Sequence, residues 1–296
     1  MGHDKLRKFA ENETFSCLIQ PSADELLSDG FLHLRDHAVK GHWAERLQAA
    51  SGDPAEIVLE LGCGKGEYTL ELARRNPQNI YIGVDIKGAR LWRGAKTATQ
   101  EALSNVAFLR TRIEFINAFF APGEVSQIWL TFSDPQMKSE NSRLTSPVFL
   151  ERYRKFLRPG GTVHLKTDSR FLHEYTKAVV AVNGFRLLAC TDNLYGDAAL
   201  GRDFQGSSAS PHPTTGFAGG PPASGPRAAR PLEIPALGGI PAEVREVQTY
   251  YESMFLQQGL PISYMAFTID GDGPIAYPRD PEDFDSKTMR AAEKAR

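Results

Sequence analysis

Short apolar stretches alternate with amphipathic stretches along most of this chain. The apolar runs, many of them rich in β-branched residues, predict strands at 57–61, 80–84, 106–109, 127–132, 162–166, 185–190 and 262–269. Helical periodicity between them predicts helices at 67–75, 88–103, 113–120, 147–157 and 171–182. Strands that alternate with helices form a parallel sheet with helices on both faces. The pattern therefore predicts an α/β protein with a mostly parallel, twisted sheet.

Changes in composition divide the chain into a main domain and its attachments. Residues 1–54 are weakly periodic and are expected to form an N-terminal arm and lead-in. The main domain is predicted to span 55–270. It is interrupted at 197–241 by a stretch rich in Gly, Pro and Ser, which predicts a flexible insertion because strand and helix signals resume after it. Residues 271–296 are rich in charge, Pro and Gly and predict a mobile C-terminal tail.

The most informative stretch is the strand at 57–61 and the loop that follows it. Three glycines there let the backbone turn sharply and approach a ligand closely, namely Gly62, Gly64 and Gly66. Their spacing differs from the dinucleotide fingerprint, and the carboxylates of Glu60 and Glu67 disfavour a pyrophosphate. These carboxylates suit a cationic ligand without phosphate, such as S-adenosylmethionine. Asp85 ends the next strand, where it is able to accept both ribose hydroxyls. A glycine-rich turn flanked by solvated acids is the alternative.

Overall composition restricts the class of protein more than it identifies a partner. The chain has 296 residues and a net charge of −2, with no apolar run of the roughly 20 residues that cross a bilayer. Its N-terminus lacks the apolar core of a secretory signal, so a cytoplasmic location without membrane association is expected. Three widely separated cysteines argue against a disulfide or zinc framework, and no metal site is predicted.

Basic residues gather in two parts of the chain despite the negative net charge. The first cluster is Lys87, Arg90, Arg93 and Lys96, and the second is Lys138, Arg143, Arg152, Arg154, Lys155 and Arg158. Such clusters form either phosphate-binding faces or solvated helix faces. Charge alone does not choose between the two interpretations.

Two aspartates follow the later strands of the predicted sheet. Asp134 lies in Phe-Ser-Asp-Pro-Gln-Met-Lys at 132–138, and Asp168 lies in Lys-Thr-Asp at 166–168. Ligands bind at the carboxyl ends of parallel strands, so both aspartates are candidates for the same pocket as Glu60 and Asp85. A helix N-cap is the alternative role for each. Thr-Tyr-Tyr-Glu at 249–252 adds a further motif in a helical segment.

In this order, Leu-Glu-Leu-Gly-Cys-Gly-Lys-Gly, Gly-Val-Asp, Asp-Pro-x-x-Lys, Lys-Thr-Asp and Thr-x-Tyr-Glu resemble the motifs of the bacterial tRNA (guanine-N7)-methyltransferases. The resemblance covers about 55–195 and 243–268. It implies a class I methyltransferase (Rossmann-like) fold, S-adenosylmethionine as methyl donor, tRNA as partner, and 7-methylguanosine as product, with the guanine of the variable loop as target. It leaves the oligomeric state open.

The resemblance also implies roles for individual residues. The expected cofactor-binding residues are Glu60, Gly62, Gly64, Gly66, Asp85, Arg112 and Asp134. Asp134 is also the expected catalytic residue. The expected tRNA-binding residues are Lys138, Asp168, Thr249, Tyr251 and Glu252.

The chain departs from the family pattern at three places. Gln136 and Met137 stand where many relatives have Trp-Pro, and the loop after them is less basic, so weaker phosphate contact by this loop is expected, offset by the basic residues at 88–96. Arg112 stands near the position where relatives often have an acid for the adenine. Met254 replaces a residue that is usually basic.

The expected chemistry follows from the groups involved. Guanine N7 carries a lone pair, so methyl transfer needs no deprotonation and depends mainly on positioning. Positive charge moves onto the purine, and an ionised Asp134 beside it would stabilise the transition state more than neutral guanine. Asp134 and Asp168 are also able to accept hydrogen bonds from N1 and N2 of guanine. The alternatives are a methyltransferase for a small molecule or a protein, and a non-catalytic RNA-binding relative.

Overall fold

The computed structural model describes residues 2–28, 33–48, 56–196 and 239–295. Most of the predicted insertion at 197–241 lies outside the described residues. The helices are α1 (Gly2–Asn12), α2 (Ala23–Leu26), α3 (Trp43–Arg46), α4 (Glu67–Arg75), α5 (Gly88–Gln100), α6 (Pro147–Arg154), α7 (Arg170–Asn183), α9 (Ala242–Glu246), α10 (Tyr250–Gln257) and α11 (Ser286–Lys294), with 3₁₀ turns η1 (Ile113–Ala118) and η2 (Glu140–Ser142). The strands are β1 (Leu18–Ile19), β2 (Leu27–Ser28), β3 (His33–Leu34), β4 (Ile57–Leu61), β5 (Ile80–Asp85), β6 (Val106–Arg110), β7 (Val125–Thr131), β8 (Leu157–Thr167), β9 (Leu187–Thr191) and β10 (Ser263–Thr268).

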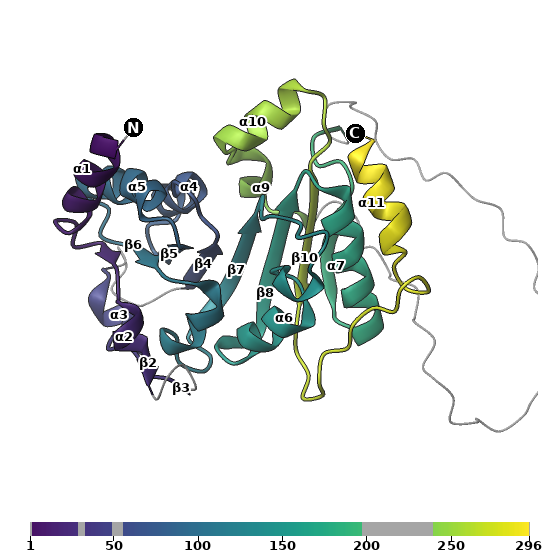
Figure 1. Cartoon of the computed structure of the whole chain (residues 1–296), viewed down its shortest axis with the longest axis horizontal. Coiled ribbons are helices and arrows are strands. Elements are labelled where there is room, and N and C mark those ends of the chain that lie inside the picture. Colours follow the sequence, from purple (N-terminus) through teal and green to yellow (C-terminus); the bar gives the residue numbers. More distant parts are fainter. Residues whose placement is uncertain (1, 29–32, 49–55, 197–238, 296) are drawn as a thin grey trace, which may run out of the picture.

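One large sheet organises the molecule, with strand order β1-β6-β5-β4-β7-β8-β10-β9 (Figure 1). From β1 to β8 along the sheet every pair of neighbouring strands is parallel, whereas β10 runs antiparallel to both β8 and β9. The strand order reverses between β4 and β7: from β4 the chain proceeds through β5 and β6 toward one edge of the sheet, and from β7 it proceeds through β8 toward the other edge. Such a switch point leaves a crevice beyond the carboxyl ends of the strands. The predicted α/β class with a mostly parallel sheet is confirmed.

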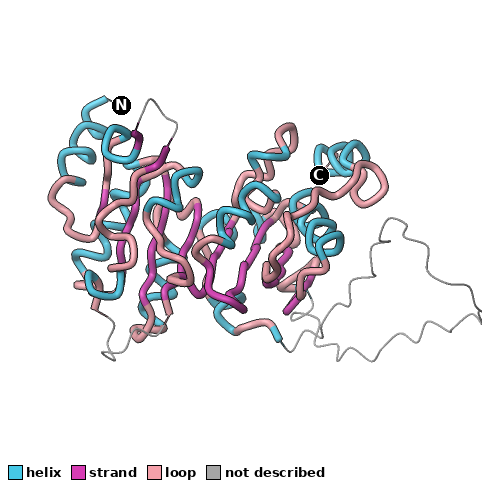
Figure 2. The backbone as a smooth tube through the Cα atoms, turned by 90° about the horizontal axis from the view of Figure 1, so that it is seen from below, coloured by secondary structure: helices cyan, strands magenta, loops and turns pink. Residues whose placement is uncertain are grey.

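Helices lie on both sides of the sheet (Figure 2). The strands contribute buried apolar side chains to a core on each face. In β7, Ile128 and Leu130 pack into one core and Trp129 packs into the other, as the period of two requires. Residues of α6 and α7 contribute to the first core, whereas residues of α4, α5 and α9 contribute to the second. Burial on both faces explains why the strands read as continuous apolar runs.

The N-terminal segment takes part in the main fold. Strand β1 pairs with β6 at the edge of the sheet, and α1 packs against α5 (Figure 1). The sequence predicted only a lead-in here, because a two-residue strand leaves almost no periodic signal. No helix in the described part of the chain is both long and apolar enough to cross a membrane.

The C-terminal segment is packed in the structure, in contrast to the mobile tail predicted at 271–296. Phe284 is buried between two aromatic side chains of α7, with ring centroids 5.2 Å from Phe171 and 5.5 Å from Tyr175. Helix α11 then lies against α7 (Figure 1). Two buried apolar side chains, Phe284 and Ile275, thus anchor a segment that is otherwise rich in polar residues.

Candidate active site

A cleft of about 880 Å³ opens at the carboxyl ends of β4, β5, β6 and β7. Its volume lies in the range of sites for small molecules and cofactors. The residues that line it are Gly62, Asp85, Ile86, Lys87, Arg90, Thr111, Arg112, Ile113, Glu114, Phe132, Ser133, Asp134, Gln136, Asn141, Ser142, Leu144, Val148, Phe149 and Arg152. The structure therefore brings Gly62, Asp85, Arg112 and Asp134 together, all of which the sequence singled out.

The three glycines of the loop have different surroundings. All adopt left-handed backbone conformations, with φ of 82° at Gly62, 58° at Gly64 and 74° at Gly66. No heavy atom lies within 4 Å of a Cβ placed on Gly62 or Gly64, whereas a Cβ on Gly66 would lie 2.4 Å from the ring of Phe108. Gly62 and Gly64 thus form an open cradle beside the cleft. Gly66 allows α4 to start close to β6.

Glu60 lies beneath the loop and is not part of the cleft lining. Its carboxylate is 4% exposed and accepts hydrogen bonds from the Thr69 backbone N at 2.9 Å and from the hydroxyls of Thr69 and Thr131. Burial raises the pKa of Glu60 to about 7, and these hydrogen bonds oppose the rise. Glu60 therefore ties together β4, α4 and β7 under the glycine cradle.

Asp85 holds the glycine loop from the neighbouring strand. Its Oδ2 accepts a hydrogen bond from the Gly64 backbone N at 3.0 Å, and its Oδ1 accepts one from the Lys87 backbone N at 2.7 Å. The carboxylate thus fixes the loop after β4 and the start of α5 at once. It lines the cleft at the end of β5, where ribose recognition was predicted.

Asp134 projects from a sharply bent loop that follows β7. The side chain is exposed, and its Oδ1 accepts a hydrogen bond from the Gln136 backbone N at 2.9 Å. Phe132 and Gln136, on either side of it, have positive φ values of 51° and 45°. Left-handed conformations are costly for residues with side chains and gather at functional sites. The loop is therefore held in a conformation that presents Asp134 to the cleft.

Arg143 braces this loop from inside the protein. Its guanidinium donates to the carbonyl oxygens of Pro135 at 3.3 Å and Met137 at 3.4 Å. The same group lies over the ring of Tyr175, 4.3 Å from the ring centroid. Arg143 is only 2% exposed, so it supports the loop from inside the protein. It is therefore not available for the phosphate contact that its place in a basic cluster suggested.

Arg112 stands at the rim of the cleft, just after β6. Its guanidinium lies 3.3 Å from a carboxylate oxygen of Glu114 and 5.7 Å from the ring centroid of Phe115. The side chain is 58% exposed. Its place in the lining agrees with the predicted contact to the cofactor, which stays a prediction.

The Thr-Tyr-Tyr-Glu motif begins α10 and divides into buried and exposed residues. Thr249 is the N-cap, and its side chain and that of Glu252 form a capping box. The Glu252 carboxylate has no exposed surface, lies 2.7 Å from the Lys166 ammonium and accepts a hydrogen bond from the Tyr195 hydroxyl at 2.6 Å. Thr249 and Glu252 were predicted to contact tRNA. The structure places both inside the protein, where they hold the start of α10.

Lys166 is the centre of this buried network. Its ammonium also donates to the carbonyl oxygens of Val244 at 2.6 Å and Val247 at 2.9 Å, which fastens α9 and its C-terminal end to β8. Burial lowers the pKa of Lys166, while Glu252 opposes that shift. No role for Lys166 was predicted from the sequence, although a lysine inside an apolar strand was an available signal.

The other residues predicted to bind tRNA are more accessible. Tyr251 is 51% exposed and lies beside Tyr250, which is 58% exposed. Lys138 is exposed on the loop after Asp134. Asp168 is half-buried and follows β8, next to the end of β7, but it is not part of the cleft lining.

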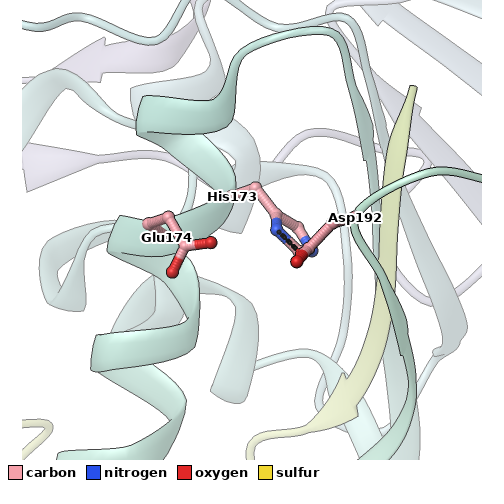
Figure 3. Close-up of side chains that lie close together, drawn as sticks. All are labelled: His173, Glu174 and Asp192. Carbon is pink, nitrogen blue, oxygen red and sulfur yellow. Dashed lines mark ion pairs between the residues drawn. The ribbon is translucent and has the colours of Figure 1, made fainter. Parts of the chain in front are cut away.

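A second group of titratable side chains lies away from the cleft, between α7 and the end of β9 (Figure 3). His173 is buried, and its Nδ1 lies 3.2 Å from the Asp192 carboxylate. The Lys177 ammonium lies 2.8 Å from Glu174 and 3.5 Å from Asp192. The nearby His173 imidazole is the main reason why the pKa of Asp192 is depressed, and Lys177 adds to the effect. Because Lys177 already supplies the positive charge between the two carboxylates, this group is an ion-pair network.

Comparison with known proteins assigns the family. A family model described as "Putative methyltransferase" matches residues 54–193. The tRNA (guanine-N(7)-)-methyltransferase of Christiangramia forsetii is 42% identical over 90% of this chain and 98% of its own length. The enzymes of the same name from Bacteroides thetaiotaomicron and Porphyromonas gingivalis are 38% and 44% identical, over 94% and 76% of this chain and 90% and 75% of their own lengths. The chain therefore belongs to the tRNA (guanine-N7)-methyltransferase family.

Proposed function

We propose that this protein transfers the methyl group of S-adenosylmethionine to N7 of a guanine in tRNA, with the variable-loop guanine as the target. The observation that carries the proposal is the cleft in which Gly62, Asp85 and Asp134 meet at the switch point of the sheet. Membership of the methyltransferase family agrees with this use of the cleft.

The cleft has the features that an S-adenosylmethionine site needs. The space beside Gly62 and Gly64 admits a ligand close to the backbone. Asp85 lies within the same lining and suits ribose hydroxyls, and Arg112 at the rim suits an adenine ring. Bound there, S-adenosylmethionine supplies a methyl group on a positively charged sulfur. Glu60, fixed below the loop by Thr69 and Thr131, contributes a carboxylate beneath the cradle.

Asp134 is the group best placed to act on the base. It is exposed toward the cleft on a loop that its own hydrogen bond to Gln136 and the brace from Arg143 hold in place. An ionised carboxylate that needs no reorganisation stabilises the positive charge that develops on the purine. To reach Asp134, the target guanine must be unstacked and turned out of the folded tRNA.

The proposal is tested by transfer of labelled methyl from S-adenosylmethionine to unmodified bulk tRNA, followed by nucleoside analysis. We expect 7-methylguanosine, and we expect Asp134→Asn to lower the rate of transfer by about 10²–10³, the usual cost of removing one electrostatic group from a transition-state site. Asp272→Asn is the matched control, because Asp272 is an exposed aspartate outside the cleft lining.

Three outcomes would contradict the proposal in different ways. An Asp134→Asn protein with near-normal turnover would remove Asp134 from the catalytic role. Tight binding of tRNA without methyl transfer would indicate a non-catalytic RNA-binding protein. Transfer to a small molecule or a protein, with none to tRNA, would indicate a different methyltransferase.

A further inference from the structure

A second depression of about 540 Å³ lies beside the cleft, between α1, α4 and α5. Its lining includes Lys8 of α1, Lys65 of the glycine loop, Arg74 of α4, and Arg90, Trp92 and Arg93 of α5. We call this depression the α5 groove. It joins the cleft at Arg90, whose side chain lines both.

The α5 groove is strongly basic on a protein whose net charge is −2. Among its lining residues Glu67 is the single acid, and its carboxylate accepts a hydrogen bond from the Tyr250 backbone N at 2.9 Å. Arg74 is paired with Glu71 and Glu101. Arg90 and Arg93 are exposed, and neither is paired with a carboxylate in the described part of the chain.

The walls of the α5 groove are fixed in place. Glu11 of α1 accepts a hydrogen bond from Trp92 Nε1 at 2.7 Å and pairs with Lys96 at 2.7 Å, which docks α1 onto α5. Lys8 lies over the Trp92 ring, 4.9 Å from its centroid. The groove therefore presents cations from two helices without first having to order them.

Spacing along α5 connects the groove to the cleft. Lys87, Arg90 and Arg93 follow one another at intervals of three residues, so they share one face of the helix. Lys87 lines the cleft, Arg90 lines both spaces and Arg93 lines the groove. A continuous row of positive charge thus leads away from the place where the guanine is proposed to react.

We propose that the α5 groove binds the sugar–phosphate backbone of the tRNA beside the target nucleotide. This proposal rests on the proposed function and extends it, because it assigns the surface that holds the rest of the substrate. A folded RNA whose guanine enters the cleft must pass its neighbouring phosphates over the rim, and the α5 groove supplies cations there. Contacts of this kind contribute affinity and register, without sequence readout.

The test measures tRNA affinity as a function of salt for a variant with Lys8→Gln and Arg93→Gln. Fluorescence anisotropy with labelled, unmodified tRNA at several KCl concentrations gives the dissociation constant and the slope of log K against log[salt]. We expect affinity at low salt to fall by about 10-fold or more and the slope to become shallower by about 1.4–1.8, roughly 0.7–0.9 for each of the two lost phosphate contacts. In methyl transfer, KM for tRNA should rise while kcat at saturating tRNA is kept.

The matched control removes two exposed cations elsewhere, in a variant with Lys155→Gln and Lys287→Gln. Both residues are exposed and lie outside the α5 groove, so this variant has the same net charge as the groove variant. Binding of S-adenosylmethionine, followed by calorimetry, should be unchanged in both variants. A rise in KM confined to the groove variant is what the proposal expects.

Two failures are distinguishable. If the wild-type protein methylates tRNA but the groove variant and the control bind tRNA equally, with equal salt slopes, the groove proposal is overturned and the proposed function stands. If the wild-type protein neither binds nor methylates tRNA, the proposed function fails, and the groove proposal fails with it.

Discussion

The basic residues at 87–96 and those between 138 and 158 both form clusters in the sequence but differ in what surrounds them. On α5, Lys87, Arg90 and Arg93 are exposed and line the cleft or the α5 groove. Lys96 is the exception, because it is paired with Glu11 at the junction of α1 and α5. Most of this first cluster remains available to a ligand.

Most residues of the second cluster bind other parts of the protein. Arg143 is buried and holds the loop after β7. Arg154 donates to the carbonyl oxygens of Ile269 at 3.1 Å and Gly273 at 2.7 Å, which anchors the turn after β10. Arg158 pairs with Glu56, and Arg152 donates to the carbonyl oxygen of Val148. Lys138 and Lys155 are exposed and, unlike Arg158, pair with no carboxylate among the described residues.

The difference shows that a run of basic residues does not by itself mark a phosphate-binding surface. Arginine is suited to either use, since its planar guanidinium binds backbone carbonyls inside a protein as well as phosphates outside it. The partners of the second cluster come from distant parts of the sequence, so no local pattern reveals them. Substitutions of buried and exposed cations should therefore have very different effects on stability.

The largest effect on stability is expected for Lys166→Met. This change leaves the buried carboxylate of Glu252 without its cation and removes the bonds to Val244 and Val247. Loss of one partner from a buried ion pair costs about 3–5 kcal/mol. Urea unfolding followed by circular dichroism measures the change. The double variant with Glu252→Gln should be less destabilised than the sum of the two single changes, and strict additivity would show that the pair is not coupled.

A somewhat smaller effect is expected for Arg143→Met. The variant keeps much of the side-chain volume but loses two hydrogen bonds from a charged donor and the contact with Tyr175. We expect the free energy of unfolding to fall by about 2–3 kcal/mol. This is less than two full hydrogen bonds to a charged group would contribute, because both bonds are long, at 3.3 and 3.4 Å, and methionine keeps part of the packing. Methyl transfer should also fall, because the loop that carries Asp134 loses its support.

Arg143→Lys separates charge from geometry in this experiment. Lysine keeps the positive charge but lacks the planar group that reaches both carbonyl oxygens, so its stability should lie between those of the wild type and Arg143→Met. Wild-type stability and wild-type activity in Arg143→Met would instead mean that this residue resembles the exposed cations of α5.

The smallest effect is expected for Arg158→Gln. Arg158 is 47% exposed, and its pair with Glu56 lies at the surface. Exposed pairs of this kind contribute about 0–1 kcal/mol, so the midpoint of thermal unfolding should change little, and tRNA affinity should stay as in the wild type. A clear loss of tRNA affinity would place the second cluster on the RNA surface after all and would remove the contrast with α5.

Much of the fold could be predicted because its signals are local. The strands from β4 to β10 and the helices from α4 to α7 were recognisable from apolar runs and helical periodicity, with shifts of a few residues at their ends. Strand β1 and the packed segment around Phe284 were not, because a two-residue strand and a few isolated buried side chains depend on partners far away in the sequence.

The candidate site was predictable for a related reason. Parallel strands end at the same edge of a sheet, so residues that follow successive strands, such as Asp85 and Asp134, meet without any further information. The left-handed turns at Gly62 and Gly64 also follow from residue type. The individual contacts of these residues could not be predicted from the sequence. Glu60 and Glu252 were predicted to bind the cofactor and the tRNA, yet both are buried.

The sequence by itself determined the order of strands and helices, the edge of the sheet that carries the cleft, and the resemblance to the family. These properties depend on short periodic patterns and on motifs that fold locally. Only the tertiary structure decided which charged side chains are buried against partners inside the protein, such as Lys166 and Arg143. It also decided which ones remain exposed, such as Arg93. The reason is physical, since the free energy of a charged side chain depends on its burial and on partners that the packed fold brings together from distant positions.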